Sequence, residues 1–307
     1  MSAERSTIAQ LSDQLADAVE RTARAVVSVH ARPRMPSTGV HWRDGIVVTT
    51  DATVKREQDI TVTLPDGRRV PAQLAGRDPG TDLAVLRIES GALPVAVLGD
   101  PSTLKPGHLV LALGRTGDGG PRAAFGAMSA TGGKWRCWKG GELDLWLQAD
   151  VTLYPGFGGG PLVSPDARVL GINSGGLSRP LTTTIPVSTV NRVLEHLLAR
   201  GYVARGWLGA AMQPVRFSDA ARARIGIEQA AGLVILSVEP DAPAALAGLM
   251  LGDVILTIDG QALEHPDQVL EILAGDVVGK TLALKYVRGG KLEHADLLVG
   301  ERPRTRR

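Results

Sequence analysis

The chain has 307 residues but only one cysteine, almost no net charge and no long apolar run. The single cysteine, Cys137, excludes an internal disulfide framework and a metal site built from several cysteines. A formal net charge of +2 gives no reason to expect nucleic acid as a partner. No apolar run approaches the roughly 18 residues of a membrane-spanning helix, and the polar start MSAERSTIAQ lacks the apolar core of a secretory leader. We therefore expect a cytoplasmic protein without a membrane span, or a periplasmic or other extracytoplasmic one if a leader has been trimmed from the chain.

Hydrophobic periodicity predicts a helix followed by a long β-rich part. The helix is amphipathic and packs either on its own body or on another subunit. Its apolar residues are Ile8, Leu11, Leu15 and Val19. Many short β-rich runs with Gly and Pro turns come next, which favours an antiparallel barrel or sandwich over a parallel α/β sheet. The next helix is expected at Val187–Arg200, with Ser188 as its N-cap and Gly201 as its stop.

A smaller unit of mixed α and β character follows a short linker after this second helix. Strands are expected at Gly232–Val238, Asp253–Ile258 and Thr281–Val287, with helices between them. We therefore expect four segments: an N-terminal helix and extension at 1–22, a β-barrel domain with a closing helix at 23–200, an α+β domain at 204–300 and a basic tail at 301–307.

Three segments of the β-rich part have the character of motifs: Gly45–Val54 (GIVVTTDATV), Asp78–Leu86 (DPGTDLAVL) and Gln148–Val163 (QADVTLYPGFGGGPLV). In this order they resemble the GYILTNNHVV, DPxTDLAVL and QTD…NPGNSGGPLV segments of HtrA-type serine proteases. Those segments carry the histidine, aspartate and serine of a catalytic triad. The resemblance implies a mostly β fold, a chymotrypsin/trypsin-like double six-stranded β-barrel followed by an α+β domain.

The resemblance puts the three catalytic positions at Ala52, Asp82 and Gly158. A serine hydroxyl attacks only when a histidine removes its proton, and an aspartate orients that histidine. Only Asp82 keeps the residue type, because alanine replaces the base and glycine replaces the nucleophile. The N–H groups of Gly156 and Gly158 could still form an oxyanion hole. The sequence leaves open whether Phe157, which replaces an asparagine of the family, fills the vacated cleft.

Two functions remain open at this point, beside a third possibility of a purely structural role in which even the PDZ domain binds nothing. The first is a pseudoprotease that binds exposed C-termini or unfolded segments without cutting them, as a chaperone, adaptor or regulatory subunit in protein quality control. The second is an active serine endopeptidase with an unrecognised base and a substitute nucleophile, for which Thr53, Thr152 and Ser164 are candidates. His41 is the histidine nearest to Ala52 in the sequence and lies upstream of it. We expect it to be a partly exposed strand residue. The resemblance also implies a homo-oligomer, commonly a trimer, or a mixture with an active paralogue, and no cofactor or metal is expected.

The α+β part carries the more specific signature. Pro240–Gly260 (PDAPAALAGLMLGDVILTIDG) closely matches the PDZ pattern SPAAxAGLxxGDVILxIDG, and Arg205–Ala210 (RGWLGA) resembles the RGWLGV of HtrA-type proteins. PDZ domains add a peptide C-terminus to a sheet edge and hold its carboxylate with backbone N–H groups. The resemblance implies that the loop supplies these N–H groups and that a helix at Asp267–Ala274 forms the other wall. The implied site residues are Trp207, Leu208, Gly209 and Ala210 in the loop and Val269, Leu270 and Leu273 on the helix. For Val269 and Leu270 a core position is the alternative, because one of the two must face inward.

Overall fold

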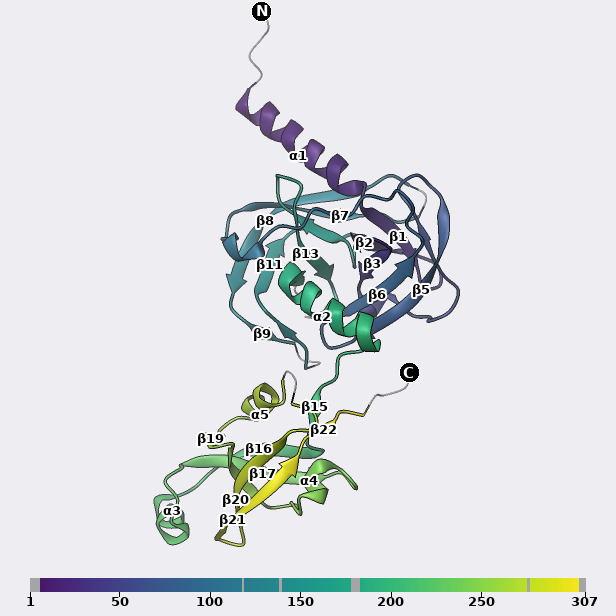
Figure 1. Cartoon of the computed structure of the whole chain (residues 1–307). Coiled ribbons are helices and arrows are strands. Elements are labelled where there is room, and N and C mark those ends of the chain that lie inside the picture. Colours follow the sequence, from purple (N-terminus) through teal and green to yellow (C-terminus); the bar gives the residue numbers. More distant parts are fainter. Residues whose placement is uncertain (1–5, 118, 138–139, 178–182, 275–276, 304–307) are drawn as a thin grey trace, which may run out of the picture. The chain divides into compact units, whose positions relative to one another are not determined.

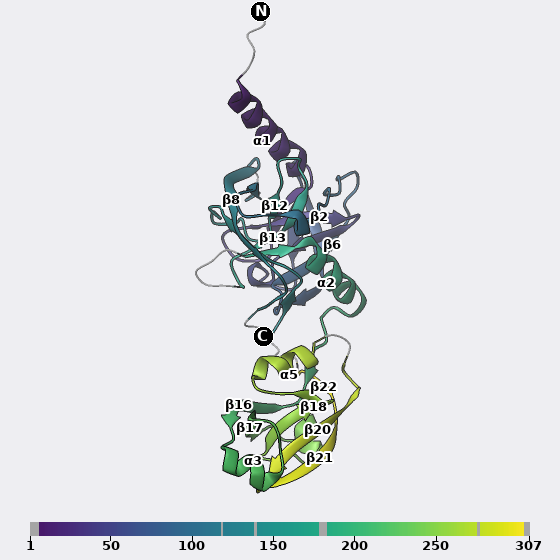
Figure 2. The ribbon, with the colours of Figure 1, turned by 90° about the vertical axis from the view of Figure 1, so that its left-hand side faces the viewer.

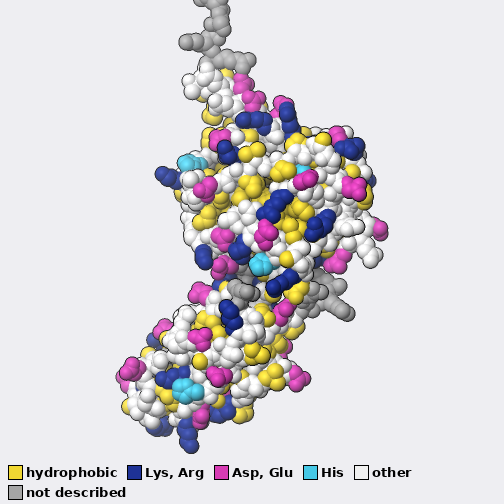
Figure 3. Space-filling view, in the orientation of Figure 1, with side chains coloured by type: hydrophobic (Ala, Val, Ile, Leu, Met, Phe, Trp, Pro, Cys, Tyr) yellow, Lys and Arg dark blue, Asp and Glu magenta, His cyan; other side chains and the backbone are white. Residues whose placement is uncertain are grey.

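The computed structural model describes residues 6–117, 119–137, 140–177, 183–274 and 277–303 (Figure 1). The chain divides into two compact units, Met1–Val203 and Ala204–Arg307. Most of the expected basic tail lies outside the described residues. On the face drawn in Figure 3, Lys and Arg side chains are interspersed with Asp and Glu side chains over both units, in keeping with the near-zero net charge.

The first unit begins with a six-stranded closed barrel. Its strands are β1 (Val26–His30), β2 (Ser37–Arg43), β3 (Ile46–Thr49), β4 (Ile60–Thr63), β5 (Arg69–Asp78) and β6 (Leu83–Ile88), paired in the order β1-β2-β3-β6-β5-β4. Inward-facing Val, Ile and Leu side chains fill its interior. The turn Pro65-Asp66-Gly67 joins β4 to β5, and Gly67 adopts the positive φ of +87° that this turn requires.

A second six-stranded closed barrel completes the sheet structure of the first unit. Its strands are β7 (Leu109–Gly114), β8 (Arg122–Gly132), β11 (Trp146–Asp150), β12 (Pro161–Val163), β13 (Val169–Ser174) and β14 (Thr183–Pro186), in the order β11-β14-β13-β12-β7-β8. Between β8 and β11 in the sequence, β9 (Trp135–Arg136) and β10 (Glu142–Leu143) form a small hairpin. The expected double barrel is therefore confirmed. β10 ends at Leu143 and β11 begins at Trp146, so the two are separate strands.

Two helices accompany the barrels (Figures 1 and 2). Helix α1 (Thr7–Ala23) packs Leu15, Ala18 and Val19 against β7 and β12, whereas Ile8 near its start is 80% exposed. Helix α2 (Val187–Arg200) buries its apolar face against both barrels and ends at Gly201 with φ of 79°. The prediction that Ser188 caps this helix is wrong. The helix follows β14 directly, so Pro186 occupies the N-cap position and Ser188 lies inside the first turn.

The second unit is an antiparallel sheet with three short helices. Its strands are β15 (Gly206–Trp207), β16 (Ala210–Arg216), β17 (Ala231–Val238), β18 (Val254–Ile258), β19 (Gln261–Ala262), β20 (Thr281–Arg288), β21 (Lys291–Leu298) and β22 (Gly300–Glu301). Its helices are α3 (Asp219–Ile225), α4 (Pro243–Leu246) and α5 (Pro266–Ile272). The main sheet runs β16-β17-β18-β20-β21, so β16 is an edge strand. The expectation of an α+β PDZ fold is confirmed.

An ion pair between the buried Asp253 and the partly exposed Arg288 fixes the turn between α4 and β18. The Asp253 carboxylate accepts hydrogen bonds from Arg288 Nε at 2.8 Å, Arg288 Nη2 at 2.7 Å and the Met250 N–H at 2.7 Å. Arg288 also donates to the Gly248 carbonyl at 2.6 Å. Burial raises the pKa of the Asp253 carboxyl, but the hydrogen bonds from Arg288 and Met250 outweigh burial and hold this pKa below its ordinary value. The carboxylate thus organises the turn only while it is ionised.

Asp253→Asn should destabilise the second unit by about 2 kcal/mol at pH 7, because it removes a charged acceptor of three hydrogen bonds. The folded-state pKa lies below the unfolded value, so the contribution is present above the unfolded pKa and disappears as the pH falls through the folded pKa. Urea denaturation of the full chain, followed by backbone amide signals of the second unit, should show the difference from wild type shrinking between pH 5 and pH 3. A pH-independent difference would contradict this account.

Candidate functional site

Asp82 lies at the start of β6 and faces the junction between the two barrels. It is 1% exposed and adopts φ of +56°, a left-handed conformation that Asp tolerates better than most residues. Its Oδ1 accepts a hydrogen bond from the Ala52 N–H at 2.7 Å. Its Oδ2 accepts one from the Ser174 hydroxyl at 2.5 Å. The carboxylate therefore ties the segment after β3 in the first barrel to the end of β13 in the second.

Gly158 faces the same segment from the other barrel. A Cβ atom at Gly158 would lie 3.4 Å from Thr53 Cγ2 and 3.7 Å from Thr50 Oγ1, which are ordinary contact distances. The backbone of Gly158 is not in the left-handed region, so an L-residue fits there without strain. The structure thus brings Ala52, Asp82 and Gly158 to one place, since the segment of Ala52 and Thr53 lies next to both Asp82 and Gly158.

The loop before β12 presents two free N–H groups. Gly156 has φ of +94°, which favours glycine. The Thr38 hydroxyl donates to the Gly156 carbonyl at 2.8 Å, and the Thr38 N–H donates to the Gly158 carbonyl at 3.2 Å. Among the residues that the structure describes, neither the Gly156 N–H nor the Gly158 N–H has a hydrogen-bond acceptor. The loop is therefore held through its carbonyls, and its amides are left for a ligand.

Phe157 lies in the core of the second barrel and not in the cleft. Its side chain is fully buried and packs with Ala112 and Ala124. The ring covers Gly114 so closely that a Cβ atom there would overlap it. Tyr154, half exposed, meets the same ring edge-on with centroids 5.5 Å apart. The question left by the sequence is thereby answered, because Phe157 points away from the vacated cleft.

The loop after β7 begins with Arg115. The Arg115 guanidinium is buried and donates to the Val26 carbonyl at 2.8 Å and the Ala23 carbonyl at 3.3 Å. Burial lowers the pKa of this guanidinium. The backbone N–H of Arg115 also donates a hydrogen bond to the Thr38 hydroxyl of β2 at 2.9 Å. The loop is thus fastened to the start of β1 and to the residue that holds Gly156.

Gly176 is a feature of the site that the sequence did not reveal. A Cβ atom at Gly176 would lie 2.7 Å from Asp82 Oδ2 and 3.2 Å from the Ala52 methyl group. The Gly176 N–H donates to the Ser174 hydroxyl at 3.0 Å, which turns the chain back over the carboxylate. The backbone of Gly176 therefore lies directly beside Ala52 and Asp82. In the sequence, the only sign of this close contact is that position 176 is a glycine. A Gly-Gly pair is an ambiguous sign, because it occurs both at close contacts and in loosely packed turns.

The other residues considered from the sequence do not form a catalytic group in this structure. The Thr53 hydroxyl donates to the Thr50 carbonyl at 2.9 Å, and Ser164 Oγ accepts from the Arg168 N–H at 3.3 Å. Within the described residues, no hydrogen bond joins Thr53, Thr152 or Ser164 to a side chain that could act as a base. The expectation for His41 is wrong: it is fully buried, with Nδ1 2.9 Å from the Pro94 carbonyl and Nε2 accepting from the Gly45 N–H.

In the second unit, the loop between β15 and β16 has the form of an anion receptor. Gly209 has φ of +74°, and a Cβ atom there would overlap the Ala242 side chain. The Leu208 and Gly209 carbonyls accept from Ala244 and Glu239, each at 2.8 Å. Their own N–H groups have no acceptor in the described part of the chain. Successive free amides beside the edge strand β16 are the arrangement that binds a carboxylate.

Helix α5 lies beside this edge strand and divides its apolar residues between two faces. Val269 and Leu273 are 3% and 7% exposed and belong to the core of the unit, whereas Leu270 is 40% exposed. Of the pair Val269 and Leu270, Val269 is therefore the one that faces inward. Leu270 remains accessible to a ligand. Trp207 and Ala210, at the two ends of the loop, are both half-buried.

A model of the trypsin-like peptidase domain matches residues 37–172, and a PDZ domain model matches residues 206–299. The structure is similar to that of the HtrA-type protease AlgW with decapeptide, with a TM-score of 0.76 and 30% identity over 95% of this chain and 99% of that chain. The chain belongs to the HtrA-type family of trypsin-like serine proteases with a PDZ domain. A serine endoprotease from Yersinia pestis also has a TM-score of 0.76, at 28% identity, covering 94% of this chain and 98% of that chain.

Curated relatives in the HtrA-type family carry the name probable periplasmic serine endoprotease DegP-like. The one from Halomonas elongata is 34% identical over 265 residues, which cover 85% of this chain and 55% of the relative. The one from Pseudomonas putida GB-1 is 35% identical over 265 residues, which cover 85% of this chain and 54% of the relative. The chain thus spans about half the length of the curated relatives it matches. None of the described helices is long and apolar enough to cross a membrane.

Gly158→Ser and Gly176→Ala should differ in their effect on stability. The serine has ordinary contact distances around its Cβ, so the free energy of unfolding should change by less than about 0.5 kcal/mol. The alanine would force the buried Asp82 carboxylate or the Ala52 backbone to move, which should cost about 1–3 kcal/mol. Urea denaturation of the full chain measures both. Gly133→Ala, where nothing lies within 4 Å of the added atom, is the control. Equal stability of the two site variants would show that Gly176 is not closely packed.

Proposed function

We propose that this HtrA-type protein does not carry out triad proteolysis and instead binds protein C-termini or unfolded segments. The observation that carries the proposal is the meeting of Ala52, Asp82 and Gly158. The two positions that should supply a base and a nucleophile supply a methyl group and a hydrogen atom. Removing members of a triad abolishes most of the rate acceleration and leaves only what binding and the oxyanion hole contribute.

The retained carboxylate supports the same conclusion. In a triad its task is to accept a hydrogen bond from a histidine ring N–H, but here its two oxygens accept hydrogen bonds from the Ala52 N–H and the Ser174 hydroxyl. The backbone of Gly176 lies directly beside the Asp82 carboxylate and the Ala52 methyl group. We infer that Asp82 is kept as a structural acceptor between the barrels, a role that does not require a histidine.

The binding function rests on the free amides of both units. The Gly156 and Gly158 N–H groups in the cleft can receive a peptide carbonyl, and the Leu208 and Gly209 N–H groups beside β16 can receive a terminal carboxylate. The similar structures of AlgW contain a decapeptide or a tripeptide, which supports peptide ligands for the family. Binding without cleavage would suit a chaperone, an adaptor or a regulatory subunit in protein quality control.

We propose an extracytoplasmic location and an oligomeric state as part of this function. The expectation of a cytoplasmic protein has no support among the curated relatives, which are named as periplasmic. The apolar residues Ile8 and Leu11 near the start of α1 are 80% and 38% exposed, so this helix can contribute to contacts between subunits. Those subunits would be copies of this chain, as in a homotrimer, or an active paralogue.

The second candidate function is an active serine endopeptidase with a non-standard site. The free amides of Gly156 and Gly158 favour it, because they form the part of the machinery that stabilises an oxyanion. The names of the relatives also favour it. It requires a nucleophile and a base that the described residues do not bring together.

The full chain should neither degrade casein nor react with a fluorophosphonate probe. Gly158→Ser should also remain unlabelled, because its hydroxyl would have no base beside it. Gel-based labelling with an intact trypsin-like protease as positive control measures this. Labelling of any serine or threonine in the wild-type chain, or casein cleavage lost in Asp82→Asn, would contradict the proposal and favour the endopeptidase.

A peptide with an apolar C-terminal residue should bind the full chain at least tenfold more tightly than the same peptide with an amidated C-terminus, because amidation removes the charge that the free amides receive. Leu270→Asp should weaken this binding, whereas Leu246→Asp on α4 should not, although both residues are exposed leucines of the second unit. Fluorescence anisotropy measures both effects. Equal affinity of the acid and the amide would leave the second unit without its proposed role.

A further inference from the structure

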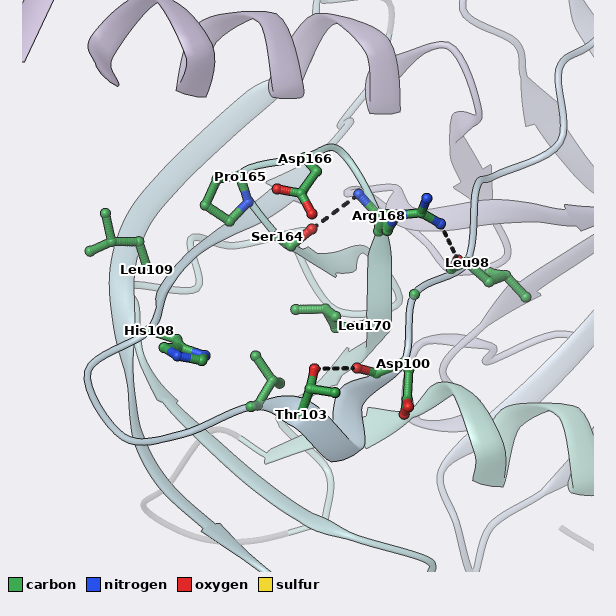
Figure 4. Close-up of a pocket in the computed structure, with 12 residues that line it drawn as sticks. Leu98, Asp100, Thr103, His108, Leu109, Ser164, Pro165, Asp166, Arg168 and Leu170 are labelled. Carbon is green, nitrogen blue, oxygen red and sulfur yellow. Dashed lines mark hydrogen bonds between the residues drawn. The ribbon is translucent and has the colours of Figure 1, made fainter. Parts of the chain in front are cut away.

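A cavity of about 780 Å³ opens in the second barrel, outside both peptide sites (Figure 4). It lies between the chain that leads into β7 and the turn that joins β12 to β13. This turn is at the opposite end of β13 from Ser174, about 17 Å along the strand at roughly 3.3 Å per residue. The volume of the cavity falls in the range of sites that bind small molecules.

One side of the cavity is apolar. Four leucines from separate points of the chain contribute to it: Leu98, Leu104, Leu109 and Leu170. Leu170 is 4% exposed and belongs to the barrel core, whereas the other three are only half-buried. Apolar surface that stays partly exposed in a concave site gains free energy when a ligand covers it.

The polar side of the cavity contains three charged residues, of which two already have partners. The Asp100 carboxylate accepts from the Ser102 N–H at 2.9 Å and the Ser102 hydroxyl at 2.8 Å, and these bonds lower the pKa of Asp100. Arg168 Nη1 donates to the Leu98 carbonyl at 3.4 Å. The Asp166 carboxylate has neither a hydrogen bond nor an ion pair with another described residue. Two carboxylates and one guanidinium give the lining of the cavity a net negative formal charge, and Asp166 is the carboxylate that is left for a ligand.

Two hydrogen bonds between Ser164 and Arg168 fix the turn that contains Asp166. The Ser164 N–H donates to the Arg168 carbonyl at 2.9 Å, and the Arg168 N–H donates back to the Ser164 hydroxyl at 3.3 Å. His108 lies across the same open space in Figure 4, with Nδ1 accepting from the Lys105 N–H at 3.3 Å. Its Nε2 and the Ser164 hydroxyl hydrogen are left as donors for a neutral oxygen of a ligand.

We propose that this cavity binds a small organic cation, an ammonium or guanidinium group carried on an apolar body. The cation lies against the Asp166 carboxylate, and the apolar body covers Leu98, Leu104 and Leu170. A metal ion is a poor fit, because no group of three or more His, Cys, Asp or Glu side chains is suitably placed in the described part of the chain. The proposal is independent of the peptide-binding function, since no residue of either peptide site lines the cavity.

Tryptamine and its neutral analogue tryptophol are suitable probes, because they share the apolar ring and differ in the charged group. We expect saturable binding of tryptamine to the full chain, with tryptophol at least fivefold weaker. Asp166→Asn should weaken the binding of tryptamine about tenfold, because the substitution removes the charge without disturbing any contact of Asp166. Glu89→Gln, an equal change of charge at an exposed residue outside the cavity, should leave the affinity unchanged. Isothermal titration calorimetry, with backbone amide shifts of residues 98–109 and 164–170, locates the site.

A second probe, acetyl-Trp-Lys-amide, separates a free amine from a lysine side chain of a polypeptide. Tighter binding of tryptamine supports a free small molecule, and tighter binding of the capped dipeptide supports a polypeptide ligand for the same cationic site. Absence of saturable binding by both, equal binding of tryptophol, or an unchanged affinity in Asp166→Asn would each overturn the proposal. So would an equal loss in Glu89→Gln, because the effect would then come from the net charge of the chain.

Discussion

The hydrogen bonds of one buried carboxylate hold the site together. Asp82 belongs to the first barrel, and it accepts from Ala52 of the same barrel and from Ser174 of the second. A buried carboxylate is costly unless donors surround it, so each of these donors is required for the other contacts to persist. The link keeps the end of β13 beside the segment after β3. The Thr38 bonds to Gly156 and Gly158 hold the opposite wall in the same way.

This arrangement explains how the cleft keeps its shape with only a methyl group at Ala52 and no side chain at Gly158. The contacts that position the loop run through backbone groups and through Thr38, and none uses a side chain at Ala52 or Gly158. The scaffold therefore needs neither a histidine nor a serine at these two positions. Two further contacts stabilise the surroundings of the loop, because Phe157 adds apolar contacts inside the barrel and Gly176 lies against the Asp82 carboxylate. Binding and catalysis depend on different atoms of the same loop.

The sequence was sufficient for the architecture because the architecture follows from regular patterns. Short β-rich runs with Gly and Pro turns predicted an antiparallel barrel or sandwich, and the resemblance to HtrA-type proteases implied two six-stranded barrels and an α+β PDZ domain, which the structure confirms. Details that depend on three-dimensional contact were not predictable. His41 is buried because the chain around Pro94 covers it, and Gly176 approaches Asp82 because Ser174 turns the chain back. The direction of Phe157 depends on the space above Gly114, a residue more than forty positions away in the sequence.

The aromatic pair in the loop bears directly on what the cleft can still do. Tyr154 and Phe157 occupy positions at which the family pattern has asparagines, and they contact each other edge-on. The buried ring requires glycine at position 114, and the same strand continues into Arg115, whose guanidinium fastens the loop to β1. These contacts resist a rearrangement of the loop, because moving it would expose the ring and unbind the guanidinium. A loop fixed in this way presents the Gly156 and Gly158 amides in a constant geometry, which suits a receptor for a peptide carbonyl whether or not a nucleophile is present.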